Sequence, residues 1–292
     1  MIQNSAPDKA DADGRIEDRT PASSESRGRV RQRLLEGVAL VPVMLTLGNG
    51  LAGFASIHFA TKAPTEANLS WAAWLLGVSM ICDMLDGQVA RFARRTSDFG
   101  AQLDSLCDAI SFGVAPAVLM LRAVVPELLP QPVAFLSFER TVWGVAALYV
   151  ACAVLRLARF NVEHDQDRDD AHLEFTGLPS PAAAAMIASL VLLAEMLAGK
   201  PWVAGGVVEW SLGLALPLVT LAVALLMVSR VPYPHVVNRY VVGKRPFGHA
   251  IRGVLIAVAA LFALHFTLVL VMALFVLSGP ASMLARHVRR SS

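Results

Sequence analysis

Long apolar stretches alternate with short polar connections along most of this chain. A helix needs about 20 apolar residues to cross a bilayer core, and backbone polar groups in lipid must be satisfied within the segment. The pattern therefore predicts an all-α bundle of membrane-spanning helices. The apolar stretches cover residues 38–60, 69–90, 103–125, 141–160, 181–199, 210–229 and 251–278.

The first 33 residues have a different composition. They carry seven basic and six acidic residues among Ser, Ala, Pro and Gly, with almost no large apolar side chains. A segment of this kind buries too little apolar surface to fold, so a disordered tail is predicted over residues 1–33. The first apolar run follows this tail and exceeds the core of a signal peptide in length, so we expect it to remain as a membrane anchor.

Arginine and lysine cluster at alternate connections, beginning with Arg27 to Arg33 before the first stretch. The positive-inside rule then places the N-terminus on the cytoplasmic side. The last stretch is followed by Arg286, Arg289 and Arg290, which a single crossing would leave outside. Residues 253–277 make about 37 Å of helix, long for one crossing, so we predict a C-terminal hairpin over 231–292 that turns near His265.

Composition supports the membrane assignment and excludes other classes. The chain is 55% hydrophobic and 16% charged, with a mean hydropathy of +0.56. Its three cysteines lie in apolar stretches without zinc-type spacing, which argues against a disulfide framework or a structural zinc site. A net charge of +2 gives no reason to expect a nucleic-acid partner.

Four carboxylates gather where the second apolar stretch ends and the third begins. Asp83 and Asp86 are three residues apart, and Asp104 and Asp108 four apart, so each pair lies on one face of its helix. If the two helices are antiparallel neighbours, all four can converge. Carboxylates in a low-dielectric region need protons or cations, and hard oxygen ligands favour Mg²⁺ or Mn²⁺, with two ions expected for a pyrophosphate substrate.

Glycine and arginine accompany these acids. Gly87 leaves room for a nucleotide to approach the backbone, and Arg91 offers a guanidinium to a phosphate. Gly100 would permit the reversal into the third stretch. The alternative is that the four acids are solvated helix ends paired with neighbouring arginines, which explains a single boundary acid better than four together.

The pattern D-x2-D-G-x2-A-R-x8-G-x3-D-x3-D, from Asp83 to Asp108, resembles the signature of the CDP-alcohol phosphatidyltransferase family. That resemblance implies a six-helix catalytic core over residues 34–230, a cavity open to the cytoplasm and two metals bound by the four aspartates. It also implies that Asp108 is the general base. A homodimer in the cell inner membrane is a further implication.

Two segments resemble the phosphatidylserine synthases of that family. They are LRLARFNV, residues 155–162, and FTGLPSPAAA, residues 175–184; SGP at 278–280 resembles the end of those synthases. Arg156 and Arg159 suit a carboxylate, and Asn161 adds amide donors, so serine is the expected acceptor. The arginines could instead be membrane anchors.

Three further polar positions are candidates for functional or structural roles. Thr46 and Asn49 resemble the family's entry pattern, in which these residues contact the cytidine nucleotide, although Thr46 could simply bond back to its own helix. Ser180 precedes Pro181, so we expect Ser180 to be the N-cap of the fifth membrane helix. The resemblance alone suggests that Ser180 also shapes the acceptor pocket.

The resulting hypothesis is a phospholipid biosynthesis enzyme that transfers the phosphatidyl group of CDP-diacylglycerol to serine and releases CMP. No serine or cysteine nucleophile stands beside a base, which favours direct displacement. Glycerol 3-phosphate or an inositol compound is the alternative acceptor. A cation transporter that uses the aspartates as an intramembrane ion site is the alternative from another class.

Overall fold

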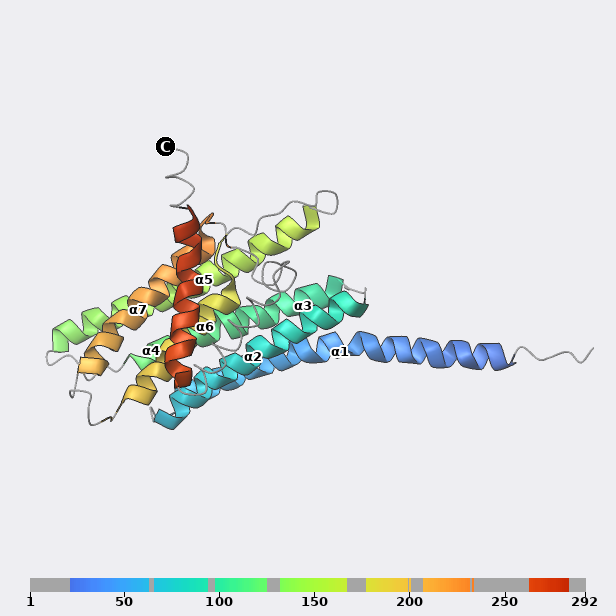
Figure 1. Cartoon of the computed structure of the whole chain (residues 1–292), viewed down its shortest axis with the longest axis horizontal. Coiled ribbons are helices and arrows are strands. Elements are labelled where there is room, and N and C mark those ends of the chain that lie inside the picture. The colour runs from blue at the N-terminus through green and yellow to red at the C-terminus, as the bar shows by residue number, and fades with distance from the viewer. Residues whose placement is uncertain are drawn as a thin grey trace, which may run out of the picture. The chain divides into compact units, whose positions relative to one another are not determined.

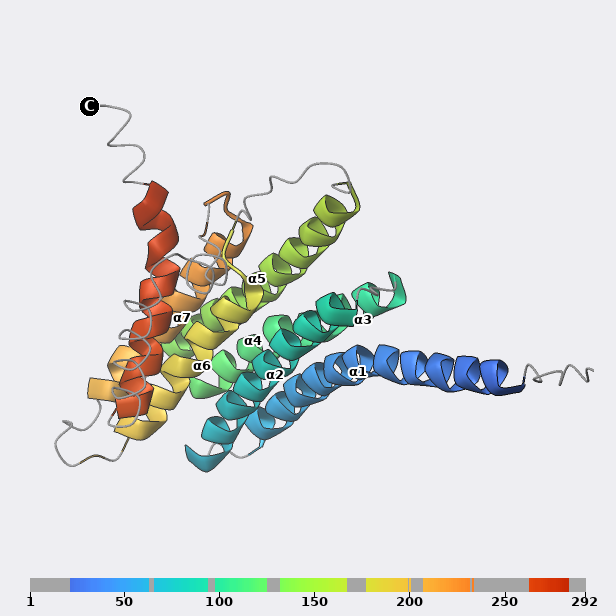
Figure 2. The same ribbon diagram turned by 45° about the vertical axis from the view of Figure 1, so that its right-hand side comes forward.

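The computed structural model describes residues 22–62, 66–93, 98–124, 132–166, 177–198, 200, 207–231, 233 and 263–283; side chains are described from Val41 onward, over most of these ranges. This part of the chain is helical, as predicted (Figures 1 and 2). The helices are α1 (Ala22–Thr61), α2 (Glu66–Ala93), α3 (Asp98–Asp108), the π-helix η1 (Ala109–Val114), α4 (Ala115–Ala123), α5 (Pro132–Gln166), α6 (Ser180–Leu197) and α7 (Val207–Val228). A further C-terminal helix covers Ala263–Met283.

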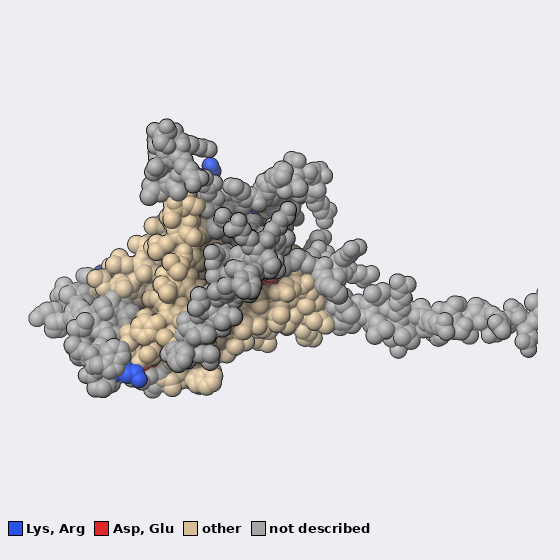
Figure 3. Space-filling view, viewed as in Figure 1, with Lys and Arg blue, Asp and Glu red and all other residues tan. Residues whose placement is uncertain are grey.

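Among the described residues, six helices are long and apolar enough to cross a membrane. They are Val41–Thr61, Ala67–Val89, Phe99–Ala123, Phe138–Val162, Ser180–Leu197 and Ala263–Met283, and a shorter apolar helix covers Gly213–Val228. Large apolar side chains such as Met44, Leu51 and Phe54 are exposed, and the described face in Figure 3 is almost free of charge. The protein is therefore a multi-pass integral membrane protein, because only lipid makes such a surface favourable.

The packing centres on α5 and α6. Helix α5 packs against α4 and α7, while α6 packs against α2 and α7. Fully buried large side chains fill the space between these helices: Leu76, Phe112, Leu119, Met120, Tyr149, Ile187, Val223 and Met227. Buried small residues such as Ala73, Ala153 and Ala184 lie among these large ones. Small side chains let the helices approach closely, and in lipid this close packing contributes to helix association.

A π-helix interrupts the third crossing directly after Asp108. Pro116 has no N–H to donate to the carbonyl of Phe112, four residues earlier, and its ring crowds that carbonyl. The freed Phe112 oxygen accepts a hydrogen bond of 2.9 Å from the hydroxyl of Tyr149 on α5. Helix widening at this point is thus explained by Pro116 and stabilised by Tyr149.

Several boundaries differ from the sequence predictions. Helix α1 begins at Ala22, inside the predicted tail, because Arg, Gln, Leu and Glu in residues 22–36 are good helix formers. Residues 1–21 lie outside the described part. Gly100 lies within α3, which begins at Asp98, so the reversal precedes this glycine.

The C-terminal end also differs from its prediction in one respect. The C-terminal helix runs without interruption from Ala263 through His265 to Met283, so the chain does not reverse at His265. A span of 21 residues is long enough for a full crossing. Residues 234–262 lie outside the described part, and a hairpin over this end of the chain remains a prediction.

Candidate active site and metal centre

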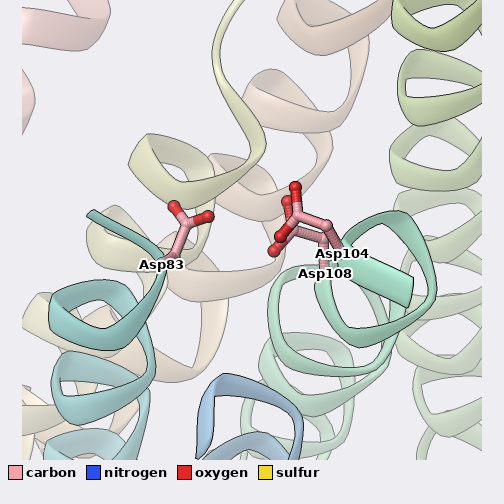
Figure 4. Close-up of side chains that lie close together, drawn as sticks. All are labelled: Asp83, Asp104 and Asp108. Carbon is pink, nitrogen blue, oxygen red and sulfur yellow. The ribbon is translucent and has the colours of Figure 1, made fainter. Parts of the chain in front are cut away.

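Three of the four aspartates meet between α2 and α3. One carboxylate oxygen each from Asp83, Asp104 and Asp108 lie within 4.8 Å of one another. Figure 4 shows the carboxylate of Asp83 directed from α2 toward those of Asp104 and Asp108 on α3. The four-residue spacing of Asp104 and Asp108 places both on one face of α3, toward Asp83, whereas Asp86 is not among the three that converge.

Asp86 is the fourth acid and has a different setting. It is buried, and one of its oxygens, Oδ2, lies 3.0 Å from the hydroxyl of Thr46 on α1. The same hydroxyl also lies 3.0 Å from the carbonyl oxygen of Pro42, so its single proton is shared between these acceptors. Asp86 still interacts electrostatically with Asp83 and Asp104. It therefore borders the three-carboxylate cluster from the α1 side.

Asn49 connects α1 to Asp108. Its side-chain amide donates a hydrogen bond of 2.8 Å to Asp108 Oδ1, and the asparagine is completely buried. The hydroxyl of Ser79 donates to the Asn49 side-chain oxygen, which fixes the amide so that its nitrogen faces Asp108. Ser111 adds a 2.9 Å bond to the Asn49 backbone carbonyl.

The sequence analysis missed both serines. Ser79 lies four residues before Asp83, and Ser111 lies three residues after Asp108, so each shares a helix face with an aspartate. Small polar residues at this spacing inside apolar stretches are a usable signal for side chains that support a polar site. Thr46 and Asn49, which were assigned to the nucleotide, contact the aspartates in this structure.

Close approach of α1 to the third crossing depends on two glycines. A Cβ added to Gly50 would lie 2.8 Å from the sulfur of Cys107, and one added to Gly53 would lie 2.7 Å from the Cα of Ser111. Neither distance is tolerable for a side chain. These glycines let the backbone of α1 come near enough for Asn49 to reach Asp108.

Helix α5 contributes Arg156 to the surroundings of the cluster. This side chain interacts electrostatically with Asp108 and Asp83, and its Nη1 donates a 2.9 Å hydrogen bond to the hydroxyl of Ser180. Its Nε is buried and has no hydrogen-bond partner among the described residues. The donor set facing the aspartates is thus only partly used, which leaves capacity for an anionic ligand.

The remaining predicted residues have varied settings. The side chain of Asn161 donates a 2.9 Å hydrogen bond to Ser105 on α3, and Arg159 lies two residues before it on α5. Gly87 is exposed, and a Cβ there would meet no atom within 4 Å, which leaves open space beside Asp86. Arg91 lies in α2, and its side chain is outside the described part.

The predicted capping role of Ser180 is wrong. Pro179 occupies the N-cap position of α6, and Ser180 is the first helical residue with no capping hydrogen bond. Its hydroxyl is turned instead to Arg156. Local sequence rules could not show this contact, because its partner lies 24 residues earlier.

The aspartate cluster fits a divalent metal. Within the described part of the chain, Oδ1 of Asp104 is buried without a hydrogen-bond partner, a setting that is costly for a carboxylate unless a cation or proton compensates it. Three carboxylates within 4.8 Å repel one another strongly in a low-dielectric region. Hard oxygen donors of this kind suit Mg²⁺ or Mn²⁺.

A model of the CDP-alcohol phosphatidyltransferases matches residues 39–228, which include α2 to α7 and the aspartate cluster. The chain belongs to the CDP-alcohol phosphatidyltransferase family. This match covers more than half of the sequence, and the signature from Asp83 to Asp108 lies inside it. The C-terminal helix lies beyond the part that the family model matches.

Several curated members of the CDP-alcohol phosphatidyltransferase family are similar to this chain. The CDP-diacylglycerol–serine O-phosphatidyltransferase of Mycobacterium tuberculosis is 33% identical over 207 residues, which cover 70% of this chain and 64% of that protein. The enzyme of the same name from Helicobacter pylori is 35% identical over 196 residues, 67% of this chain and 72% of that protein.

An archaeal relative is similar to the same degree. The archaetidylserine synthase of Methanothermobacter thermautotrophicus is 34% identical over 198 residues, which cover 67% of this chain and 70% of that protein. The match spans between 56% and 64% of the length of the mycobacterial relatives. Relatives from both bacteria and archaea thus match about two thirds of this chain.

Proposed function

We propose that this protein transfers the phosphatidyl group of CDP-diacylglycerol to the hydroxyl of serine, giving phosphatidylserine and CMP. The observation that carries the proposal is the convergence of Asp83, Asp104 and Asp108 within 4.8 Å in a member of the CDP-alcohol phosphatidyltransferase family. Serine is favoured as acceptor because the similar proteins from Mycobacterium tuberculosis and Helicobacter pylori are named for it.

Asp83, Asp104 and Asp108 would hold the metal, with Asp86 completing the set for a second ion. Bound divalent ions would neutralise the pyrophosphate oxygens and stabilise the departing phosphate. Their identity, Mg²⁺ or Mn²⁺, and their number remain part of the proposal. Chelation should abolish turnover, and addition of Mn²⁺ or Mg²⁺ should restore it.

Asp108 is proposed as the general base. It takes the proton of the serine hydroxyl while the serine oxygen forms a bond to the lipid-side phosphorus. The bond between that phosphorus and the CMP oxygen breaks, and the electron pair leaves with CMP. Asn49 supports this role because its amide orients Asp108 through Oδ1 and leaves Oδ2 for other contacts.

The acceptor is proposed to bind beside Arg156. The guanidinium has an unused buried Nε and interacts with Asp108, so a serine carboxylate held there brings its hydroxyl to the proposed base. Arg159 and Asn161 are proposed as further acceptor contacts, and Gly87 and Arg91 as contacts of the nucleotide phosphates. The open space at Gly87 supports its proposed contact with the nucleotide phosphates.

The first test is CMP release by the purified protein with CDP-diacylglycerol and Mn²⁺. We expect release that depends on serine and not on glycerol 3-phosphate or inositol phosphate. Release with another acceptor would retain the chemistry and reject serine. Absence of release with every acceptor, from folded protein, would reject the transferase and favour an intramembrane cation site.

Asp108→Asn tests the base. The carboxamide keeps the shape of the side chain but cannot accept the proton, so kcat should fall by about 10²–10⁴-fold. Glu139→Gln is the matched control, because Glu139 is an exposed acid on α5 outside the cluster. Substantial turnover by Asp108→Asn would contradict the assignment.

A further inference from the structure

Tyr233 joins the segment after α7 to the C-terminal helix. Its hydroxyl donates a 3.0 Å hydrogen bond to the carbonyl of Val276, and its ring centroid lies 5.8 Å from that of Phe275. A Cβ on Gly279 would lie 2.7 Å from the Cε1 of this ring, so the contact requires glycine there. A tyrosine phenol is a donor at neutral pH even with its ordinary pKa near 10, and burial raises the pKa of Tyr233 further, to about 12.

The same segment fixes the turn that begins α6. The amide of Gly177 donates a 2.9 Å hydrogen bond to the carbonyl of Val231, two residues before Tyr233, and the amide of Leu178 donates one of 3.0 Å to Leu226. Gly177 has a φ of +93°, and a Cβ there would collide with the carbonyl of Met227. This backbone therefore has one accessible arrangement against the end of α7.

Ser180 connects this turn to Arg156, which lies near the aspartate cluster. It follows Gly177 by three residues, is completely buried, and accepts the 2.9 Å hydrogen bond from Arg156 Nη1. Arg156 in turn interacts with Asp108 and Asp83. Hydrogen bonds and short lengths of chain thus connect the C-terminal helix to the guanidinium: Tyr233 bonds to Val276, nearby Val231 bonds to Gly177, and Ser180, three residues after Gly177, bonds to Arg156.

We propose that Tyr233 and the C-terminal helix position Arg156 for the acceptor, with Ser180 as the last link. The inference rests on the proposed function, in which Arg156 binds the carboxylate of serine. Tyr233 and Ser180 are positioning residues that touch no substrate. The C-terminal helix lies beyond the residues that the family model matches. In this proposal, a helix outside the matched region therefore helps to position the residue that binds the acceptor.

The test compares the KM values for the two substrates. In the full-length purified protein, Tyr233→Phe removes only the bond to Val276, and Ser180→Ala removes only the bond to Arg156. Loss of one hydrogen bond should raise the KM for serine about fivefold in each variant. The KM for CDP-diacylglycerol and kcat should stay within about twofold of wild type.

Two further variants sharpen the comparison. Gly279→Ala pushes against the Tyr233 ring and should also raise the KM for serine. Thr267→Ala is the control, since this exposed hydroxyl bonds only within the C-terminal helix, to Ala263, and its kinetics should match wild type. The double variant Tyr233→Phe, Ser180→Ala should be no worse than the poorer single variant, because both act through one guanidinium.

An unchanged KM for serine in Tyr233→Phe would overturn the inference. An equal rise in the KM for serine and the KM for CDP-diacylglycerol, together with a lower melting temperature, would also overturn the inference. That result would indicate general destabilisation of the protein. A wild-type protein that uses another acceptor rejects serine alone, and the KM for that acceptor must then rise in Tyr233→Phe. A wild-type protein that releases no CMP rejects the proposed function and the inference with it.

Discussion

Asn49 shows how a single side chain organises the aspartate cluster. Its amide nitrogen binds Asp108, its side-chain oxygen accepts from Ser79, and its backbone carbonyl accepts from Ser111. Asparagine is suited to this position because it offers a donor and an acceptor at once without adding charge. A buried network in which the nitrogen and both oxygens of one asparagine are hydrogen-bonded favours a single geometry of the groups it connects.

Replacement of Asn49 by Ala should weaken the metal site. Asp108 Oδ1 and the Ser79 hydroxyl would lose their partner, and loss of such an orienting contact typically costs about 10–100-fold in metal affinity. We expect the Mn²⁺ concentration for half-maximal CMP release to rise by about that factor. Titration of Mn²⁺ at saturating substrates measures it.

Ser56→Ala is the matched control for Asn49→Ala. Ser56 is also a buried residue of α1, and its hydroxyl donates a 2.8 Å hydrogen bond to the carbonyl of Ala72 on α2, away from the aspartates. This substitution removes a helix–helix bond without touching the cluster. A shift in Mn²⁺ dependence of equal size in both variants would refute the specific role of Asn49.

At the scale of elements, the third crossing is shaped by one proline. Pro116 frees the Phe112 carbonyl, and the widened η1 turn begins immediately after Asp108. Tyr149 from α5 and Gly53 from α1 then meet this turn from two sides. The η1 turn directly follows α3, which carries Asp104 and Asp108. It is held in place by the Tyr149 hydrogen bond and by close backbone packing against α1.

Gly53→Ala should separate α1 from η1. The added Cβ would lie 2.7 Å from the backbone Cα of Ser111, which cannot turn away as a side-chain tip can. Overpacking of this kind typically costs about 1–3 kcal/mol, so we expect a lower melting temperature in detergent and a lower rate of CMP release. Thermal unfolding followed by circular dichroism measures the melting temperature.

Gly77→Ala and Gly144→Ala are controls for this substitution. Both glycines lie within helices, and a Cβ at either would meet no atom within 4 Å. Alanine favours a helix over glycine by about 1 kcal/mol, so these variants should be as stable as wild type or more stable. If the melting temperature of Gly53→Ala is no lower than that of these two variants, then α1 and η1 tolerate the extra methyl group.

For the molecule as a whole, the C-terminal helix runs toward the aspartate end of the bundle. Its first turn lies beside α2, where the His265 and Trp74 rings are 6.5 Å apart, and Trp74 lies about 13 Å along α2 from Asp83. Its later part binds Tyr233, just beyond the end of α7. The described contacts therefore place Gly279 on the aspartate side and His265 away from it.

This direction predicts where the C-terminus lies. Since the positive-inside rule places the aspartate end in the cytoplasm, the arginines after Met283 should be cytoplasmic as well. Green fluorescent protein fused after Ser292 should fluoresce, and alkaline phosphatase fused there should be inactive. Fusions after Lys200, in a connection expected on the other side, should give the reverse. Active phosphatase after Ser292 would contradict the predicted orientation.

Sequence periodicity was sufficient for the elements and for the aspartates. The thickness of a bilayer fixes the length of an apolar helix, so the first six apolar helices could be predicted to within a few residues. The spacing of Asp83, Asp86, Asp104 and Asp108 follows the helical repeat, so the face that each pair occupies was also predictable. These features depend on residues close together in the chain, and the sequence by itself determined them.

Only the tertiary structure decided which distant side chains meet. Asn49 lies 59 residues from Asp108, and Tyr233 lies 43 residues from Val276. Helical periodicity gives the face of a helix but not the neighbour that covers it. For the same reason Ser180 was predicted as a cap from its local sequence, whereas its hydroxyl binds Arg156. Local rules describe one helix at a time, and the site is made where several helices pack together.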